Sequence, residues 1–313
     1  MKKILVTGAS GFVGQSLCEA LSKSGRFVVG AVRNLNIILI NKNIEYISVG
    51  DISVKKNWKV SLFNMDCIIY CAGRAHETKK DKNYDAYQLA NIDGTKHLVE
   101  QVVETGVKRL VFLSSIGVNG LYTNDRNSFS NLDEPNSLEN YGKSKYQAEK
   151  ILLDILNKTE LEVVIIRSLL IYRSFMEGNL KRLLKLVKLG IPLPFGGAKK
   201  SKSFIGINNL TDLLNHCINH PRAGGKTFLA LDSEDLSTPK FIKLIVSSTV
   251  RKTNLFSLHI VIRKFLGSIF GRRKEINKLV GSLRIDNSYT KEILNWTPPI
   301  SVEEGIRRMV QRK

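Results

Sequence analysis

An apolar run, Ile4-Leu5-Val6, leads directly into the segment TGASGFVG at residues 7–14, and no other stretch constrains the fold more. The pattern predicts a buried strand, a glycine turn and a helix. Gly8 permits a sharp turn, Gly11 has no side chain to keep a pyrophosphate from the first free N–H groups of the helix, and Gly14 permits close helix–strand packing. The spacing Gly-x-x-Gly-x-x-Gly favours a dinucleotide site, and an ordinary strand-to-helix turn is the alternative.

A tyrosine and a lysine four residues apart form the second signal. Segment 141–156 has apolar residues at helical spacing, so Tyr141 and Lys145 share one helix face. A free tyrosine has a pKa of about 10, and a neighbouring cation lowers it, which makes the phenol a usable acid or base near neutral pH. Tyr-x-x-x-Lys also occurs on solvated helix faces, so the pair indicates a site only together with the glycine motif.

Two serines end a predicted buried strand, KRLVFLSS at residues 108–115. In doubly wound sheets, ligands bind beyond the carboxyl ends of the strands, where Ser114 and Ser115 fall. We expect one hydroxyl to cap the following turn and the other to take part in chemistry.

Strand-like and helical patterns alternate along the chain of 313 residues. The predicted strands are 3–7, 27–32, 45–49, 66–71, 108–114 and 161–166, and the predicted helices include about 12–24, 86–105 and 141–157. This order predicts an α/β fold, a Rossmann-like doubly wound parallel sheet with a smaller C-terminal α/β substrate lobe. The expected domains are a dinucleotide-binding domain at 1–172, with returning elements at about 203–222, and a lobe at 173–202 and 223–313.

Taken together, these segments resemble the extended, nucleotide-sugar branch of the short-chain dehydrogenase/reductase superfamily, the NAD-dependent epimerase/dehydratase family. The matching segments are TGASGFVG, Gly50-Asp51-Ile52, Cys71-Ala72-Gly73-Arg74, Asn91-Ile92-Asp93-Gly94-Thr95, SSIGVNG at 114–120, YGKSK at 141–145, and Leu294-Asn295-Trp296-Thr297-Pro298 with Glu303-Glu304-Gly305. One segment departs from the family pattern. The family's Arg-Pro-x-x-x-Tyr-Gly reads Arg167-Ser168-Leu169-Leu170-Ile171-Tyr172-Arg173, without the proline and the final glycine.

The resemblance implies a catalytic triad of Ser115, Tyr141 and Lys145. Ser115, not Ser114, matches the family's serine when counted back from Gly120. The implied cofactor contacts are Gly8, Ser10, Gly11, Phe12, Val13, Arg33, Asp51, Ile52, Ala72, Gly73, Arg74, Asn91, Tyr141 and Lys145. The substrate contacts that we predict are Ser114, Ser115, Asn179, Arg182 and Lys202. Ordinary exposed polar side chains are the alternative for the last three.

The end of the second predicted strand bears on cofactor preference. An acid there would bind the adenosine ribose 2′-hydroxyl and select NAD, but the chain reads Val29-Gly30-Ala31-Val32-Arg33-Asn34. Arginine forks well onto a phosphate, so Arg33 favours NADP(H). NAD(H) is the alternative, if Arg33 only stacks on adenine.

SSIGVNG, PLPFGG at 192–197 and SFIGINNL at 203–210 most resemble a subgroup labelled UDP-glucose 4-epimerase, which includes UDP-4-keto-sugar 4-reductases. A net reductase consumes a fresh hydride donor each turnover, which suits NADPH. We therefore predict reduction of UDP-2-acetamido-2,6-dideoxy-4-hexulose to UDP-N-acetylquinovosamine for O-antigen, a lipopolysaccharide component. The alternative is a UDP-glucose or UDP-GlcNAc 4-epimerase. A non-catalytic nucleotide-binding regulator is a remote alternative, and dehydration is disfavoured because Ile116 and Gly117 stand where dehydratases of this branch carry acids.

The chain is basic, with 48 Lys+Arg against 28 Asp+Glu and a formal net charge of +20. Such an excess can attract nucleic acid, anionic membranes or phosphorylated substrates. The basic residues are spread along the chain and no nucleic-acid motif is present, so we expect a solvated surface that helps to capture a nucleotide diphosphate and binds no nucleic acid.

Other features bear on location and assembly. The four cysteines, Cys18, Cys67, Cys71 and Cys217, show no metal-ligand clustering, so we expect free thiols, no metal and a reducing, cytoplasmic location. We expect no signal peptide and no transmembrane helix. Residues 255–283 mix apolar and basic types, and we favour a packed lobe helix over one lying on an anionic membrane. A homodimer through 86–105 and 141–157 is possible by resemblance.

Overall fold

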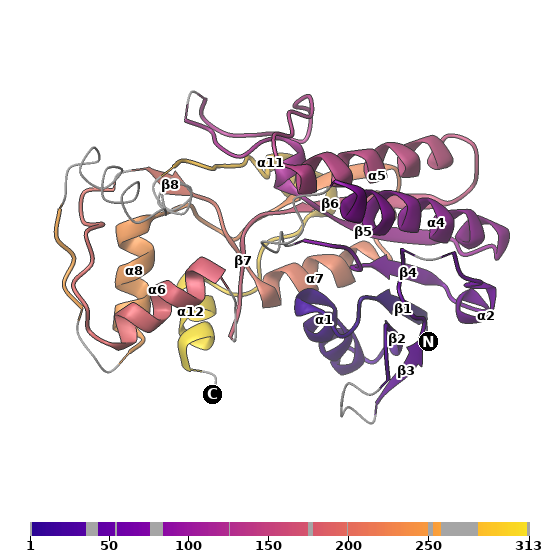
Figure 1. Cartoon of the computed structure of the whole chain (residues 1–313), viewed down its shortest axis with the longest axis horizontal. Helices are drawn as coiled ribbons and strands as arrows, with labels where there is room; N and C mark the ends of the chain where they lie inside the picture. Colours follow the sequence, from indigo (N-terminus) through magenta and orange to yellow (C-terminus); the bar gives the residue numbers. More distant parts are fainter. Residues whose placement is uncertain are drawn as a thin grey trace.

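The computed structural model describes residues 2–35, 43–53, 55–75, 84–124, 126–174, 178–198, 200–249, 253–257 and 281–311. A parallel sheet of seven strands lies between two layers of helices, and a smaller group of helices and short strands lies beyond one end of it (Figure 1). The strands are β1 (Lys3–Thr7), β2 (Phe27–Val32), β3 (Ile44–Ser48), β4 (Cys67–Tyr70), β5 (Arg109–Ser115), β6 (Glu162–Ser168) and β10 (Lys226–Ala230). This architecture confirms the predicted fold class.

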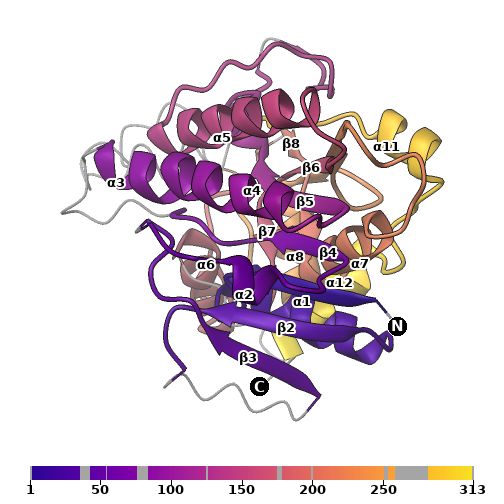
Figure 2. The ribbon, with the colours of Figure 1, turned by 90° about the vertical axis from the view of Figure 1, so that its right-hand side faces the viewer.

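Alternate residues of each strand face opposite helical layers, because successive side chains of a strand point to opposite faces. Ile4 and Val6 of β1 pack on the layer of α1 (Phe12–Lys23) and α7 (Ile207–Cys217), whereas Leu5 packs on the other layer. That second layer contains α2 (Lys59–Leu62), α4 (Gly94–Glu104) and α5 (Asn140–Leu156) (Figure 2). Both faces of the sheet are therefore buried, which is why its strands read as nearly continuous apolar runs.

The strand order is β10-β6-β5-β4-β1-β2-β3, so the winding of the chain reverses between β1 and β4. The connections from these two strands lead away in opposite directions, and a crevice opens at their carboxyl ends. The register places Thr7 of β1 beside Ala31 of β2 and Tyr70 of β4, so the three turns that follow lie together.

The helix predicted at 86–105 is confirmed, and it contains a π-helical turn that was not predicted. It consists of α3 (Asp85–Tyr87), a π-helical turn η1 (Gln88–Asp93) and α4. A Cβ on Gly94 would lie 2.7 Å from Ile52 O, so this helix passes very close to the loop after β3. Wider turns of this kind are common at functional sites, and η1 contains the buried Asn91.

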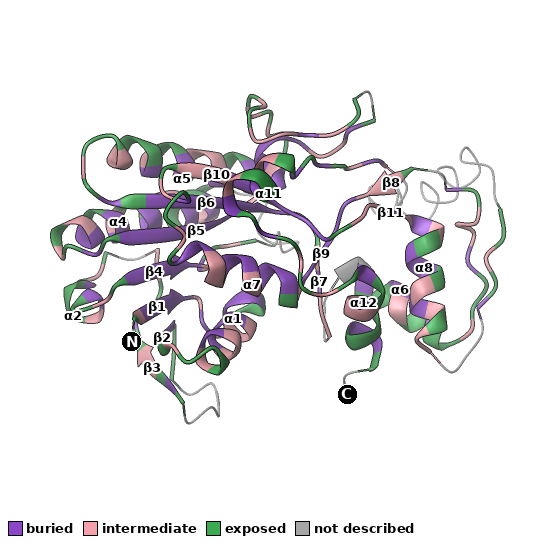
Figure 3. Ribbon diagram, turned by 180° about the vertical axis from the view of Figure 1, so that it is seen from behind, coloured by how far each residue is buried: buried purple, intermediate pink, exposed green. Residues whose placement is uncertain are grey.

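The smaller part of the molecule has its own apolar core, which includes Leu183, Phe204, Phe241 and Ile306. Figure 3 shows the buried strands of the sheet and the mixed exposure of the helices around them. The elements beyond the sheet are β7 (Ile171–Tyr172), α6 (Gly178–Lys188), β8 (Ser201–Lys202), β9 (Ile205–Gly206), β11 (Leu236–Ser237), α8 (Thr238–Ser247), α11 (Ser288–Leu294) and α12 (Val302–Gln311). A short 3-10 turn, η2 (Ile116–Val118), follows β5.

One predicted domain boundary needs correction. The lobe was expected to include all of 223–313, but β10 pairs with β6 as the last strand of the main sheet. Phe228 of β10 is fully buried in the core shared with α7. Without β10, the apolar strand β6 would form an open sheet edge, so the chain returns from the lobe to cover it.

All four cysteines are free, as predicted, and three of them are buried. Of the predicted amphipathic segment 255–283, residues 258–280 lie outside the described part of the chain, so its packing stays a prediction. Among the residues that the structure describes, no helix is both long and apolar enough to cross a membrane.

Candidate active site

The carboxyl ends of β1, β2, β3 and β4 line a cavity of about 350 Å³ at the point where the sheet reverses its winding. Strand ends at such a reversal are where doubly wound sheets bind ligands. The structure brings nine of the predicted cofactor contacts together here: Gly8, Ser10, Gly11, Arg33, Asp51, Ile52, Ala72, Gly73 and Arg74.

The glycine turn is built by contacts that exclude any larger residue. Gly8 has φ +67°, and a Cβ there would lie 2.9 Å from the backbone of Ala72. A Cβ on Gly14 would lie only 2.1 Å from Gly8 O. Gly11 caps α1 without a side-chain hydrogen bond, so the N–H groups of the first turn, which begins at Phe12 and Val13, stay open to an anion. This cradle fits a dinucleotide pyrophosphate.

Asn91 fixes the turn after β4. Its Oδ1 accepts from Arg74 N at 2.8 Å, and its Nδ2 donates to Arg74 O at 3.0 Å and to Ser144 Oγ at 2.9 Å. A Cβ on Gly73 would lie 3.0 Å from Asn91 Oδ1 and 3.5 Å from Lys145 Nζ. The cavity floor, η1 and α5 therefore meet at Gly73.

Lys145 is buried beside this floor, with 4% of its surface exposed. Its Nζ donates to Leu113 O at 2.8 Å and lies 4.4 Å from the centroid of the Phe112 ring. Burial lowers the pKa of Lys145 to about 8, while Cys71 and Glu149 partly oppose that shift. A lysine that titrates near physiological pH is a feature of functional sites.

Tyr141 is half-buried in the first turn of α5, and its ring centroid lies 6.4 Å from that of Tyr87. Burial, and then the nearby Tyr87, raise the pKa of Tyr141 to about 12. This is opposite to the predicted lowering by Lys145. The cause is that desolvation disfavours the phenolate, whereas the lysine is itself desolvated and bound to a carbonyl oxygen. Tyr141 therefore keeps its proton at neutral pH.

The two serines divide their roles differently from the prediction. Ser114, a predicted substrate contact, is 2% exposed, and its Oγ donates to Glu149 Oε1 at 2.5 Å. Its side chain is thus turned into the protein and away from a substrate, which corrects that prediction. Ser115 is half-buried, and its Oγ accepts from Gly117 N at 3.1 Å, which leaves the hydroxyl proton available for donation. The capping serine is therefore Ser115.

Arg33 and Asp51 are two charged residues of the cavity, at the end where we predict that the adenosine of the cofactor binds. Arg33 is exposed at the end of β2. The hydrogen bonds that Ser53 donates hold the pKa of Asp51 below its usual value, and Arg33 and Arg74 add to this effect. No acid stands at the end of β2 itself, so the anion in this region comes from the loop after β3.

Two of the three predicted substrate residues of the lobe have side chains in the described part of the chain. Arg182 is exposed on α6, and Lys202 lies in β8, where it pairs with Leu236. Neither lines the cofactor cavity, and the side chain of Asn179 lies outside the described part of the chain. Their contacts with substrate stay predictions.

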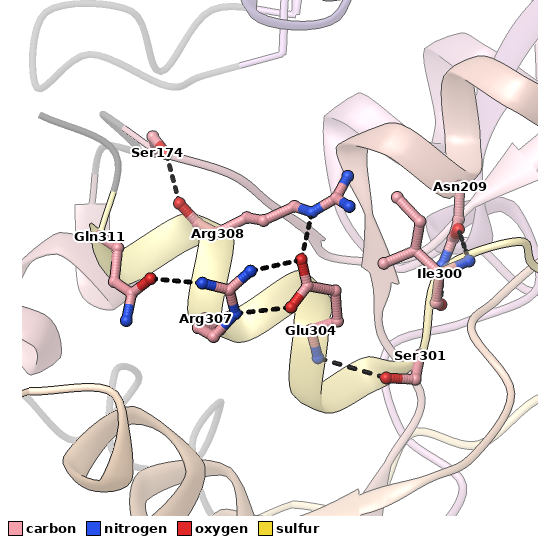
Figure 4. A network of polar contacts seen from close by, with 8 residues as sticks. All are labelled: Ser174, Asn209, Ile300, Ser301, Glu304, Arg307, Arg308 and Gln311. Carbon is pink, nitrogen blue, oxygen red and sulfur yellow. Dashed lines mark hydrogen bonds and ion pairs between the residues drawn. The ribbon is translucent and has the colours of Figure 1, made fainter.

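A second cavity, of about 700 Å³, lies between α1, α7 and α12 and shares no lining residue with the first. Figure 4 shows the polar network of α12 beside it, in which Glu304 accepts hydrogen bonds from Arg307 and Arg308. Ser174 Oγ donates to Arg308 O at 3.1 Å, and Asn209 Nδ2 donates to Ile300 O at 2.9 Å. These bonds join the closing helix to the residues after β7 and to α7.

Comparison with known proteins adds to this geometry. A family model described as "NAD dependent epimerase/dehydratase family" matches residues 4–229. The chain belongs to the NAD-dependent epimerase/dehydratase family. This confirms the resemblance inferred from the sequence motifs.

Individual proteins match this chain over most of their length. A Vibrio cholerae protein described as UDP-glucose 4-epimerase is 37% identical, over 99% of this chain and 95% of its own. An Escherichia coli O157:H7 enzyme, N-acetyl-alpha-D-glucosaminyl-diphospho-ditrans,octacis-undecaprenol 4-epimerase, is 27% identical over 80% of this chain and 73% of its own. The crystal structure of UDP-glucuronic acid 4-epimerase from Bacillus cereus with NAD shares the fold, with a TM-score of 0.78, 21% identity and coverage of 98% of this chain and 97% of its own.

The structure also shows residues at this family site that the sequence analysis missed. Thr7 Oγ1 accepts from Ala72 N at 3.2 Å, and Cys71 lines the cavity. Glu149 and Arg167 form a buried ion pair next to Ser114. A signal for this pair was present, because a charged residue at the end of an apolar strand needs a partner.

Proposed function

We propose that this enzyme transfers a hydride at C4 of a UDP-linked hexose, and that its net reaction is reduction of a 4-keto sugar. The substrate class is supported by the 37% identical relative, whose description names UDP-glucose. The proposed reaction is reduction of UDP-2-acetamido-2,6-dideoxy-4-hexulose to UDP-N-acetylquinovosamine, a step in surface polysaccharide assembly. Arg33 is the observation that carries this direction, because it lines the cavity at the end of β2, where it favours NADPH, and a net reductase consumes NADPH in each turnover.

The chain's own side chains would act on the oxygen of the carbonyl. Ser115 donates a hydrogen bond to that oxygen through its free hydroxyl proton. When bound, the nicotinamide supplies the hydride that adds to C4. Tyr141 then gives its proton to the alkoxide, so the ketone becomes a secondary alcohol and the phenol becomes a phenolate that solvent reprotonates. Lys145 favours that transient phenolate through its charge.

The cofactor in this proposal is NADP(H), held by the glycine cradle and Lys145, while Asn91 fixes the turn after β4. Arg33 supports the preference, because its exposed guanidinium lines the cavity and can pair with a 2′-phosphate. NAD(H) is the alternative, and the family description names NAD.

Epimerisation at C4 is the second candidate, and the descriptions of both curated relatives favour it. An epimerase removes the C4 hydride and returns it to the other face, so it needs no external hydride donor. It also needs Tyr141 to act first as a base and then as an acid.

The deciding experiment is incubation of the purified protein with NADPH and UDP-4-keto-6-deoxy-N-acetylglucosamine, followed by identification of the product by NMR. One NADPH oxidised for each 4-hydroxy sugar formed supports the reductase. Interconversion of UDP-glucose and UDP-galactose types without added NADPH supports the epimerase and overturns the reductase. Tight nucleotide binding without turnover of any of these sugars supports a regulator and overturns both enzymes.

A matched pair of variants tests the proton donor. Tyr141→Phe removes the hydroxyl, and we expect kcat to fall about 100-fold or more. Tyr146→Phe changes a half-buried tyrosine one turn later on α5, and kcat should stay within about twofold of the wild type. Turnover of Tyr141→Phe within about tenfold of the wild type, roughly 1.4 kcal/mol, would show that another group supplies the proton.

A further inference from the structure

We propose that the buried ion pair of Glu149 and Arg167 is a positioning device for the active site. It holds the end of β5 against α5, so that Ser115 and Lys145 keep a fixed relative position, and its carboxylate keeps Lys145 charged. The inference rests on the proposed function for its catalytic meaning, but its physical content is testable without turnover.

The pair is fully enclosed and well oriented. The side chains of Arg167 and Glu149 are 7% and 1% exposed. Arg167 Nε donates to Glu149 Oε1 at 3.1 Å, and Arg167 Nη2 donates to Glu149 Oε2 at 2.7 Å. Burying two charges carries a large desolvation cost, and apolar residues of similar volume often stabilise a fold as well or better. We therefore infer a role other than stability for these two buried charges.

Further hydrogen bonds connect the pair to both proposed catalytic segments. Glu149 accepts from Ser114, the residue immediately before Ser115, and lies one helical turn after Lys145 on α5. Arg167, at the end of β6, donates from Nη1 to Asn119 Oδ1 at 3.0 Å. Asn119 Nδ2 in turn donates to Ser130 O at 3.0 Å. The pair thus joins α5, β5, β6 and the loop after η2.

The pair also sets the charge around Lys145. Among the residues that the structure describes, the Leu113 carbonyl and the Phe112 ring of β5 contact the ammonium, and the Cys71 thiol after β4 and the Glu149 carboxylate of α5 act on it electrostatically. Burial raises the pKa of Cys71 to about 12, so this thiol is neutral at physiological pH. Glu149 is therefore the anion of this group, and it favours the charged form of Lys145.

The test follows the titration of Lys145 in the cofactor-free protein by the NMR shift of its Cε carbon, assigned with Lys145→Met. In Glu149→Gln, which keeps the shape of the side chain, we expect the midpoint to fall by about half a unit or more. Glu149→Asp keeps the charge and should retain the wild-type midpoint. The matched control is Asp154→Asn, which removes a carboxylate from the exposed Asp154–Lys158 pair on the same helix and should leave the midpoint unchanged.

Glu149→Gln leaves Arg167 buried without its partner, which threatens folding. The double variant Glu149→Gln/Arg167→Met removes both charges and serves as the second test. We expect its midpoint to fall as well, though less than in Glu149→Gln, because Glu149 lies one helical turn from Lys145 and the loss of the Arg167 cation offsets only part of the loss of the carboxylate. A wild-type midpoint in either folded variant overturns the charge role.

Turnover provides the second readout. We expect kcat of the folded double variant to fall about tenfold or more with KM within about threefold, because misplaced catalytic groups slow the chemical step more than they weaken binding. Wild-type kcat would overturn the positioning role. If the wild type itself turns over none of the substrates above, the proposed function fails, while the NMR result still decides whether Glu149 controls Lys145.

Discussion

Asn91 binds both backbone polar groups of Arg74, accepting from its N–H at 2.8 Å and donating to its carbonyl at 3.0 Å. This double contact ties η1 to the turn after β4. Because the same turn contains Gly73 on the cavity floor, the contact sets the shape of the floor. The asparagine therefore supports the proposed dinucleotide site without being one of the residues that line the cavity.

We expect Asn91→Asp to weaken dinucleotide binding about tenfold, since a carboxylate cannot donate to Arg74 O or Ser144 Oγ, and loss of a buried donor costs about 1–3 kcal/mol. Fluorescence titration with NADPH and NADH measures the effect. The same substitution at the exposed Asn219 is the control and should leave Kd unchanged. Wild-type affinity in Asn91→Asp would show that the floor keeps its shape without these bonds.

We expect Gly14→Ala to destabilise the fold by about 2 kcal/mol or more and to abolish dinucleotide binding, because its Cβ would meet Gly8 O at 2.1 Å. Gly25→Ala is the comparison, since Gly25 has φ +79° and open space around it. It should cost about 1 kcal/mol through backbone strain alone and keep full binding. Urea denaturation measures the stability of both variants, and ligand titration measures their dinucleotide binding. Equal losses of stability and binding in the two variants would contradict the steric role of Gly14.

We expect Arg33→Ala to lower kcat/KM with NADPH about tenfold or more while changing that with NADH less than threefold, because a bidentate phosphate contact is lost. The ratio of the two kcat/KM values is the measurement. The control is Arg222→Ala. Arg222 is exposed and comes just before β10, which lies at the opposite edge of the sheet from β2 and β3, so its loss should leave the ratio unchanged. An unchanged ratio in Arg33→Ala would mean that the arginine does not recognise the 2′-phosphate.

We expect Lys145→Met to be more stable than the wild type at pH 7. The pKa of Lys145 falls from 10.5 to about 8 on folding, so between these values the unfolded chain binds more protons and wild-type stability rises with pH. Below pH 8 the buried charge lowers the stability of the wild type by about 3 kcal/mol, and the hydrogen bond to Leu113 O offsets part of this cost.

Urea denaturation of the wild type and Lys145→Met at pH 7 and pH 10 measures this difference. The advantage of the variant should shrink at pH 10. Lys143→Met, on the exposed side of the same helix, should show no pH-dependent difference from the wild type. An advantage that is equal at both pH values would indicate that folding leaves the pKa of Lys145 unchanged.

The sheet was predictable because buried parallel strands are continuous apolar runs, and the six predicted strands match β1 to β6 within one or two residues. β10 was missed because Lys226–Ala230 comes after lobe segments in the chain, so its sequence gives no sign that it returns to the main sheet. The need to cover the edge of β6 is what indicates its place. The two-residue strands β7, β8, β9 and β11 are too short to produce a pattern.

The cradle was predictable for a different reason, since Gly8, Gly11 and Gly14 reflect local steric demands that the backbone imposes on the sequence. The direction of the pKa shift of Tyr141 was not predictable from the sequence. Helical spacing shows that Lys145 is near, but it does not show how far both groups are desolvated. The π-helical turn at Asn91 was hidden because its apolar spacing is also that of an ordinary helix.

The late return of β10 has a consequence during synthesis. The ribosome releases β6 well before Lys226, and in the interval the nascent chain must make the whole of α6, α7 and the short strands between them. Over that time the outer edge of β6 has no hydrogen-bonding neighbour, and an open apolar edge readily pairs with other chains. Productive folding of this enzyme thus depends on keeping a growing polypeptide apart from its neighbours until Ala230 has emerged.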